Sequence, residues 1–279
     1  NVADLFPFGN GGISHRGGIV WGYDNLTRPI FYDGWHPSLM NNNMLILGQS
    51  GGGKTVAVMA LTNRSAHIGV KTVIIDPKGD YRTWILASEC PYIDLSQNSH
   101  HKINFFDVDV EESPDGKQYV NLESTVQAAR AIVFKMIRIM DETVLTGKMK
   151  VKIENKIREL YKDRKITEDP SSLIDNSAGT HQNNGVLTFS LAGMKKKMPQ
   201  LGDLFLLLYE DGETKEVAEL IRNFTIHGDA PSQAIFDTES TVHLNDAPII
   251  GFGLDKLDEE IMRPIGLFIA TKWQSDKFA

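Results

Sequence analysis

The chain has 279 residues, of which 41% are hydrophobic and 23% are charged, and its formal net charge is −7. This length is enough for one large globular domain or two modest ones with a buried core. The acidic balance argues against a uniformly basic nucleic-acid binder and leaves a local basic patch open. No apolar run reaches the roughly 18 residues needed to cross a bilayer, and no signal-peptide pattern is present at the start.

The two ends indicate a fragment, because the sequence begins at Asn1 rather than Met and stops at Ala279 inside an apparently helical stretch. We expect any membrane or targeting segment to lie outside it. Cys90 is the single cysteine, which excludes an intramolecular disulfide and fits a reducing compartment. The eight histidines include the adjacent His100 and His101 but form no metal-binding pattern, so solvated loop histidines are expected.

The first elements expected along the chain are two short strands, Gly18–Gly22 and Pro29–Tyr32, joined by a turn-rich segment. We predict a hairpin beside the core. An apolar run, Met44–Leu47, follows, and it predicts a central strand directly before the glycine-rich sequence Gly-Gln-Ser-Gly-Gly-Gly-Lys-Thr. A helix with its packed face starting at Val56 is expected next.

This strand, loop and helix predict a phosphate-binding loop rather than a plain glycine-rich turn. Glycines allow positive φ angles and let backbone N–H groups approach phosphate oxygens, where a Cβ would obstruct. Lys54 offers a charge to the β- and γ-phosphates, Thr55 offers its hydroxyl to Mg²⁺, and the pattern therefore favours ATP-type ligands. The predicted nucleotide-binding residues are Gly48, Gln49, Ser50, Gly51, Gly52, Gly53, Lys54, Thr55 and Val56.

A second strand is predicted at Lys71–Asp76, whose β-branched residues are typical of a strand buried on both faces. With the preceding helix it makes a βαβ unit. Shorter candidate strands are Pro91–Leu95 and Ala247–Leu254. Together these elements predict an α/β fold with a parallel sheet.

Asp76 and Asp80 follow the second strand in Asp-Pro-Lys-Gly-Asp-Tyr. Ligands of open α/β sheets bind beyond the carboxyl ends of strands, so both carboxylates are expected near the triphosphate. Either could hold a Mg²⁺-bound water or polarise the attacking water, and Asp80 is the stronger candidate for a catalytic role beside Lys54. The alternative is that they shape a Pro-Gly turn and cap the next helix.

Helical periodicity dominates the region 121–224, with Asn121 as the expected N-cap of a long amphipathic helix. Two further helices are expected around Ile153–Tyr161 and Val217–Phe224, and Asp169–Gly185 is expected to be a loop. The basic stretch of this region could contact nucleic acid or anionic lipid, but a solvated helix face is the favoured interpretation. Its residues are Lys148, Lys150, Lys152, Lys156 and Arg158, with Lys195, Lys196 and Lys197 further on.

The phosphate-loop sequence paired with Ile-Ile-Asp-Pro-Lys-Gly-Asp-Tyr resembles the FtsK/HerA-related branch of P-loop motors. Further segments are similar to the TraC/CagE-type (VirB-type) ATPases of type IV secretion and conjugation. These segments are Lys102–Asp107, Met198–Leu204, Ile249–Leu257 and Pro264–Ile265. The resemblance covers most of the chain.

This resemblance implies a RecA-like core interrupted by a helical insertion, with the core at 1–120 and 225–279 and the insertion at 121–224. It implies ATP and Mg²⁺ as cofactors and a homo-oligomer that is a hexamer in the intact protein. The expected location is cytoplasmic, at the inner face of the cell membrane, with secretion-channel components as partners. DNA is a further possible partner.

Two features depart from the family pattern: Phe105 stands where proline is frequent, and no apolar strand closing in Asp-Glu is present. We expect that acidic pair beyond Ala279, because Asp255 and the Asp258–Glu260 run instead suit a loop and a helix start. An arginine that reaches a neighbouring subunit's nucleotide is also expected. Its candidates are Arg64, Arg82, Arg222 and Arg263.

Three functions remain open from the sequence. The leading one is an ATPase that powers type IV secretion, conjugative transfer and channel or pilus assembly. A DNA-pumping translocase or coupling protein would show ATPase activity stimulated by DNA, with strong salt dependence. A nucleotide-gated scaffold would bind ATP with almost no turnover.

Overall fold

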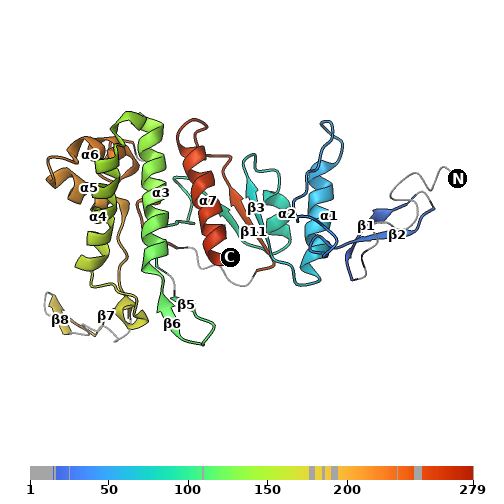
Figure 1. The fold of residues 1–279 in the computed structure, drawn as a ribbon, viewed down its shortest axis with the longest axis horizontal. Helices are drawn as coiled ribbons and strands as arrows, with labels where there is room; N and C mark the ends of the chain where they lie inside the picture. Colours follow the sequence, from blue (N-terminus) through green and yellow to red (C-terminus); the bar gives the residue numbers. More distant parts are fainter. Residues whose placement is uncertain are drawn as a thin grey trace. The chain divides into compact units, whose positions relative to one another are not determined.

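The computed structural model describes residue 15 and residues 17–24, 26–108, 110–175, 180–183, 186–189, 194–230, 232–241 and 247–278 (Figure 1). The chain divides into two compact units. The first comprises Asn1–Tyr92 and Leu244–Gly253, and the second comprises Ile93–His243 and Leu254–Ala279.

The predicted hairpin is confirmed in the first unit. Strand β1 (Ile19–Tyr23) pairs antiparallel with β2 (Pro29–Tyr32). Asp24 holds the connecting turn, since one carboxylate oxygen accepts the N–H groups of Leu26 and Arg28 at 2.8 and 2.9 Å. The other oxygen pairs with the Arg28 guanidinium at 2.7 Å. A short acidic side chain that bonds to the backbone just ahead is the usual chemistry of such turns.

The predicted α/β class with a parallel sheet is confirmed as well. Strand β11 (Ile249–Gly253) lies between β3 (Thr72–Asp76) and β4 (Tyr92–Asp94), and β3 and β11 run parallel. All five residues of β11 are buried. A Cβ at Gly251 would lie 2.6 Å from the Tyr92 ring, so glycine lets this ring pack directly on the strand.

Helix α1 (Lys54–Ala66) follows the glycine-rich loop, as predicted, and α2 (Arg82–Ala87) follows the loop after β3. The packed face of α1 does not start at Val56 as expected, because Val56 is 67% exposed. The strand predicted at Met44–Leu47 is wrong, because residues 41–49 lie in no strand. Leu45 and Leu47 are each 80% exposed. A strand exists only through ladder hydrogen bonds, and no other described segment pairs with the backbone of residues 44–47. The apolar composition of residues 44–47 was therefore not enough to predict a strand.

The second unit contains a group of packed helices, and Figure 1 shows α3 (Leu122–Asp141) and α4 (Gly147–Asp163) side by side. Helix α5 (Leu201–Glu210) packs on α4 and on α6 (Lys215–Ile221), and α7 (Met262–Phe278) packs on α3. The predicted helical periodicity is confirmed by the burial of the apolar stripe of α3. Its fully buried members include Val126, Ala129, Val133, Met136 and Ile137.

Short elements connect these helices. Two antiparallel pairs are β5 (Val110–Glu112) with β6 (Gln118–Val120), and β7 (Ile174–Asp175) with β10 (Met194–Lys195). The segment predicted as a loop, Asp169–Gly185, contains a 3₁₀ turn (Pro170–Leu173), β7 and β8 (Thr180–Asn183), which pairs with β9 (Val186–Phe189). Residues 176–179, 184 and 185 of that loop lie outside the described part. Further 3₁₀ turns are Glu142–Val144, Arg222–Phe224 and Ala234–Phe236.

Among the described helices, none is long and apolar enough to cross a bilayer. The domain boundaries at residues 120 and 224 stay a prediction.

Candidate nucleotide-binding site

The glycine-rich loop adopts a backbone that depends on its glycines. Gly51 and Gly53 have φ angles of +77° and +78°, in the left-handed region that side chains rarely tolerate. Between them, the Gly52 N–H donates to the Gln49 carbonyl at 3.1 Å, and a Cβ at Gly52 would lie 3.0 Å from the same oxygen. Apart from the two adjoining residues, no described residue has an atom within 4 Å of a Cβ built at Gly51 or Gly53. The result is a tight turn with an open outer face.

The first turn of α1 leaves its backbone N–H groups free of side-chain caps. Its N-cap is Gly53, no side chain bonds to the first-turn N–H groups, and no acidic residue lies in that turn. These donors and the positive end of the helix dipole therefore face outward without a competing anion. A phosphate is the kind of ligand that such a helix start accommodates.

Lys54 folds over this turn. Its Nζ donates to the carbonyl oxygens of Gly48 and Gln49, both at 2.9 Å. An ammonium group has three N–H donors, so two carbonyls leave one direction for a further acceptor. The side chain thus holds a positive charge against the first two residues of the loop.

Asp76 shapes the neighbouring loop rather than offering a free carboxylate. It is 1% exposed, and Oδ1 accepts the N–H groups of Gly79 and Asp80 at 2.9 and 3.1 Å. Oδ2 accepts the N–H of Tyr81 at 2.9 Å and the Tyr92 hydroxyl at 3.2 Å. With its acceptor positions occupied by these donors, Asp76 positions the loop and is not arranged as a metal ligand.

Asp80 has the opposite character. Its side chain is exposed, and no hydrogen bond or ion pair from another described residue holds its carboxylate. The suggested cap of the next helix does not form, since α2 has Tyr81 at its N-cap and no side-chain cap. The backbone of Asp80 is fixed by Asp76 while its carboxylate remains available for other contacts. Its catalytic role stays a prediction.

Tyr81 is a site residue that the sequence did not single out. Burial and the negative charges of Asp76 and Asp80 raise the pKa of Tyr81, and a hydrogen bond with the Thr55 side chain opposes this rise. The only sequence signal was the position of Tyr81 at the end of Asp-Pro-Lys-Gly-Asp-Tyr.

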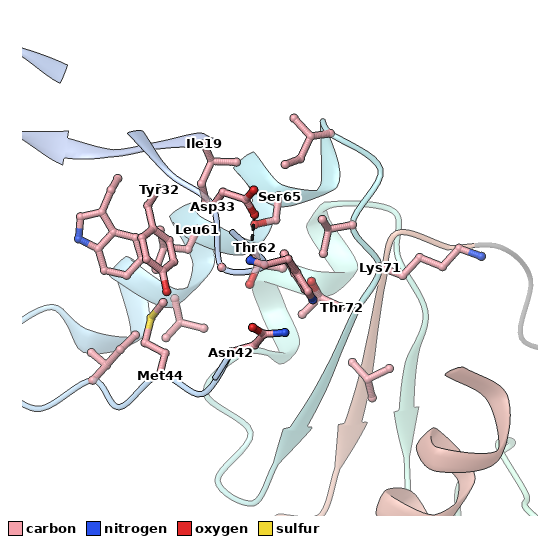
Figure 2. Close-up of a pocket in the computed structure, with 18 residues that line it drawn as sticks. Ile19, Tyr32, Asp33, Asn42, Met44, Leu61, Thr62, Ser65, Lys71 and Thr72 are labelled. Atoms are coloured by element: carbon pink, nitrogen blue, oxygen red, sulfur yellow. Dashed lines mark hydrogen bonds between the residues drawn. The ribbon is translucent and has the colours of Figure 1, made fainter. Parts of the chain in front are cut away.

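A separate groove of about 370 Å³ lies along the later turns of α1, and none of residues 48–55 lines it. Figure 2 shows side chains from the hairpin, from residues 42–44, from α1 and from the start of β3 around this space. Its lining is mainly apolar and includes Trp21 and Trp35. The groove is therefore distinct from the predicted phosphate site.

The basic stretch on α4 is largely paired within its own unit. Lys148 and Lys152 contact Glu213 at 2.6 and 2.7 Å, and Arg158 contacts Glu123 at 2.7 Å. Hydrogen bonds from the two lysines lower the pKa of Glu213 to about 2. These partners favour a solvated, ion-paired helix face over a nucleic-acid surface.

The four candidate arginines all have partners within their own units. Arg64 donates to the Val20 carbonyl at 2.5 Å, and Arg82 lies over the Tyr92 ring at 5.5 Å. Arg222 forms an ion pair with Glu219, and Arg263 forms an ion pair with Glu259.

Asp258 accepts the N–H groups of Glu260 and Ile261 just before α7, as expected for a helix start.

Comparison with known proteins identifies the class. Residues 36–228, well over half of the chain, match the family described as "Helicase HerA, central domain". The chain belongs to this family of P-loop ATPases, whose members bind ATP and oligomerise.

The structure of VirB4 of Thermoanaerobacter pseudethanolicus is similar in fold, with a TM-score of 0.66 and 20% sequence identity. The alignment covers 95% of this chain and 66% of that one, so the present chain spans less than two thirds of the VirB4 chain. No curated protein matches.

Proposed function

We propose that this protein binds ATP with Mg²⁺ at the loop Gly48–Val56 and hydrolyses it to power a type IV secretion or conjugation machine. The observation that carries the proposal is the uncapped first turn of α1, where open glycines and the Lys54 ammonium present donors to an anion. Membership of a P-loop ATPase family supports ATP as that anion.

The residues divide the work by their chemistry. The N–H groups of the loop and of the first turn of α1 hold the phosphates, and Lys54 exchanges a carbonyl partner for a phosphate oxygen. Thr55, half-buried in that turn, has a hydroxyl suited to Mg²⁺, which neutralises charge on the phosphates when bound. Asp80, carried by the Asp76-held loop, orients the attacking water.

The biological setting is proposed from the resemblance to VirB4 and to the secretion ATPases. In this proposal the intact bacterial protein forms a hexamer at the cytoplasmic face of the inner membrane and contacts secretion-channel components. The segments 1–120 and 225–279 form the motor core, and 121–224 forms its helical insertion.

Turnover at different protein concentrations tests the motor function. An arginine contributed by a neighbouring subunit adds about 10³ to 10⁵ in rate, so ATP turnover per subunit of the full-length protein should rise as rings assemble. Constant turnover well below the assembly constant would contradict the shared site. No turnover at any concentration, with ATP still bound, would favour a nucleotide-gated scaffold.

A DNA translocase is the second candidate, because the matching family is described as a helicase. The paired charges on α4 do not favour it. ATPase stimulation by duplex DNA that falls steeply between about 50 and 200 mM salt would support the translocase. Equal turnover with and without DNA would exclude it.

A further inference from the structure

We propose that a second cavity of this protein binds a small aliphatic carboxylate, whose charged group pairs with the ammonium of Lys102. The cavity has a volume of about 360 Å³, and all its lining residues belong to the unit formed by Ile93–His243 and Leu254–Ala279. None of residues 48–56 lines it. The site is therefore separate from the proposed ATP site and does not depend on it.

Lys102 brings a positive charge to the wall of this cavity, where its side chain is half-buried. Its Nζ donates to the carbonyl oxygens of Gln97 at 2.9 Å and of Ser96 at 3.4 Å. An ammonium group has three N–H donors, so one direction remains for a further acceptor. No acidic side chain in the described ranges forms an ion pair with Lys102, and burial lowers its pKa. A charge withdrawn from water without a counter-charge favours an anionic ligand.

Asp237 also lines the cavity, but backbone donors hold its carboxylate. The side chain is 4% exposed, with Oδ1 accepting the Gly202 N–H at 2.7 Å and Oδ2 accepting the Ile226 N–H at 2.8 Å. Hydrogen bonds of this kind compensate a buried negative charge. Asp237 therefore joins the start of α5 to residue 226, and Lys102 is left as the charge in the cavity wall that lacks such compensation.

The walls of the cavity are fixed by hydrogen bonds between distant segments. The Lys102 N–H donates to the Thr241 hydroxyl at 2.9 Å, and the Thr241 N–H donates to the Lys102 carbonyl at 3.1 Å. Thr225 is 1% exposed, and its hydroxyl donates to the Arg222 carbonyl at 2.7 Å. At Gly228 a Cβ would lie 2.5 Å from the same carbonyl oxygen, so this turn requires glycine. The lining is thus formed before any ligand binds.

The remaining lining selects the body of the ligand. Ile226, Ala234 and Ile235 give the cavity an apolar surface. Ile226 is 67% exposed and Ile235 is 6% exposed, so this surface extends from solvent into the wall. Ligand pockets have volumes of about 300 to 1,000 Å³, and a cavity at the lower end of this range suits a small molecule. Apolar side chains around a single uncompensated cation match an aliphatic chain that ends in a carboxylate.

The experiment is a ligand-observed NMR titration of the full-length protein with 4-methylpentanoate and, in parallel, with its uncharged amide, 4-methylpentanamide. The two probes share one apolar body and differ in charge. A ligand of this size in a preformed pocket should bind with a Kd of about 1 mM. The amide should bind about tenfold more weakly, because a charge-assisted hydrogen bond is roughly twice as strong as a neutral one.

Lys102→Met keeps the apolar stem, removes the charge and should abolish the difference between acid and amide. Lys102→Arg should preserve the difference. Ile226→Asp places a negative charge at an exposed position of the lining, and it should weaken binding of the acid about tenfold or more and that of the amide much less. Lys117→Met, which removes an exposed lysine that does not line the cavity, is the matched control.

Equal affinity of the wild-type protein for acid and amide, or no binding of the acid up to about 20 mM, would overturn the site. Unchanged binding of the acid by a folded Lys102→Met protein would overturn it as well. Melting temperatures show whether the variants fold. If Lys102→Met does not fold, Ile226→Asp decides the question, since acid binding equal to that of wild type in this variant contradicts the proposal.

Discussion

The helix starts of this chain fall into two kinds. The first turns of α3, α4 and α5 are closed by their own side chains, with Asn121 bonded to the Ser124 N–H at 3.1 Å and Thr146 to the Met149 N–H at 3.3 Å. Helix α5 has a capping box between Gln200 and Asp203. Helix α1 has no side-chain cap. Helices α2 and α6 also begin without a side-chain cap, so the ligand site at α1 is indicated by the glycine loop and the Lys54 ammonium beside its open start.

The charged side chains of α3 and α4 differ in the same way from those near the start of α1. On α3 and α4, acids and bases neutralise one another, as in the contacts of Arg158 with Glu123 and Glu154 at 2.7 and 2.9 Å. Near α1, Lys54 is bound only to loop carbonyls and the Asp80 carboxylate has no described partner. Helices α3 and α4 pair their charged groups with one another, whereas Lys54 and Asp80 keep theirs for an external partner.

The largest expected effect is on turnover. Asp80→Asn should lower ATP hydrolysis by the full-length protein about 10²- to 10⁴-fold, because the amide cannot accept a proton from water. Nucleotide affinity should stay nearly unchanged. Asp115→Asn, in an exposed turn, is the control. Normal turnover in Asp80→Asn would place the water-orienting acid outside this loop.

Stability should separate the two neighbouring acids. Asp76→Asn replaces one carboxylate oxygen by an NH₂ group, which cannot accept a hydrogen bond. Two donors, such as the Tyr81 N–H and the Tyr92 hydroxyl that share Oδ2, then lose their acceptor. The free energy of unfolding should fall by about 2 to 6 kcal/mol in denaturant titration, at about 1 to 3 kcal/mol for each unsatisfied donor. Asp80→Asn should change it by no more than about 0.5 kcal/mol. Equal effects of the two substitutions would contradict the anchoring role of Asp76.

The capped helices can be tested in the same way. Asn121→Ala removes the bond to the Ser124 N–H and should lower the free energy of unfolding by about 1 kcal/mol. Asn121→Asp keeps an acceptor at this position and should preserve most of the stability. Neither change should alter ATP affinity. A loss of affinity in Asn121→Ala would break the distinction between the two kinds of helix start.

The smallest effect is the acid sensitivity of the α3–α4 pair. Hydrogen bonds from Arg158 and then Gln127 lower the pKa of Glu123 from 4.5 to about 2. A depressed folded-state pKa contributes stability above pH 4.5, and this contribution is lost as the pH falls toward 2. Thermal melts should show a shallower decline over this range for Glu123→Gln than for wild type or the exposed control Glu112→Gln. Identical slopes would show that the ion pair is fully screened.

Local patterns were enough to predict most elements of this fold. The hairpin, the β-branched strand β3, helices α3 and α4, and the Asn121 cap each depend on residues close in sequence. The glycine motif likewise predicted where α1 begins. Predictions of this kind succeed because turn chemistry, capping and periodicity act over a few residues.

The errors concern contacts between distant segments. Met44–Leu47 had the composition of a strand, but strand formation also needs a partner that composition cannot supply. The role of Asp76 depends on the Tyr92 hydroxyl, 16 residues away. No spacing rule predicts such pairs, because the fold alone brings them together.

The most direct test of the account is calorimetric titration of the full-length protein with MgATP, using wild type, Lys54→Ala and Lys117→Ala. Lys54→Ala removes a charge-assisted contact to phosphate worth about 1.5 to 3 kcal/mol, so affinity should fall about tenfold or more. Lys117→Ala, which removes an exposed charge far along the sequence, should bind like wild type. Equal affinity in Lys54→Ala and wild type would contradict the assignment of the open start of α1 as the ATP site.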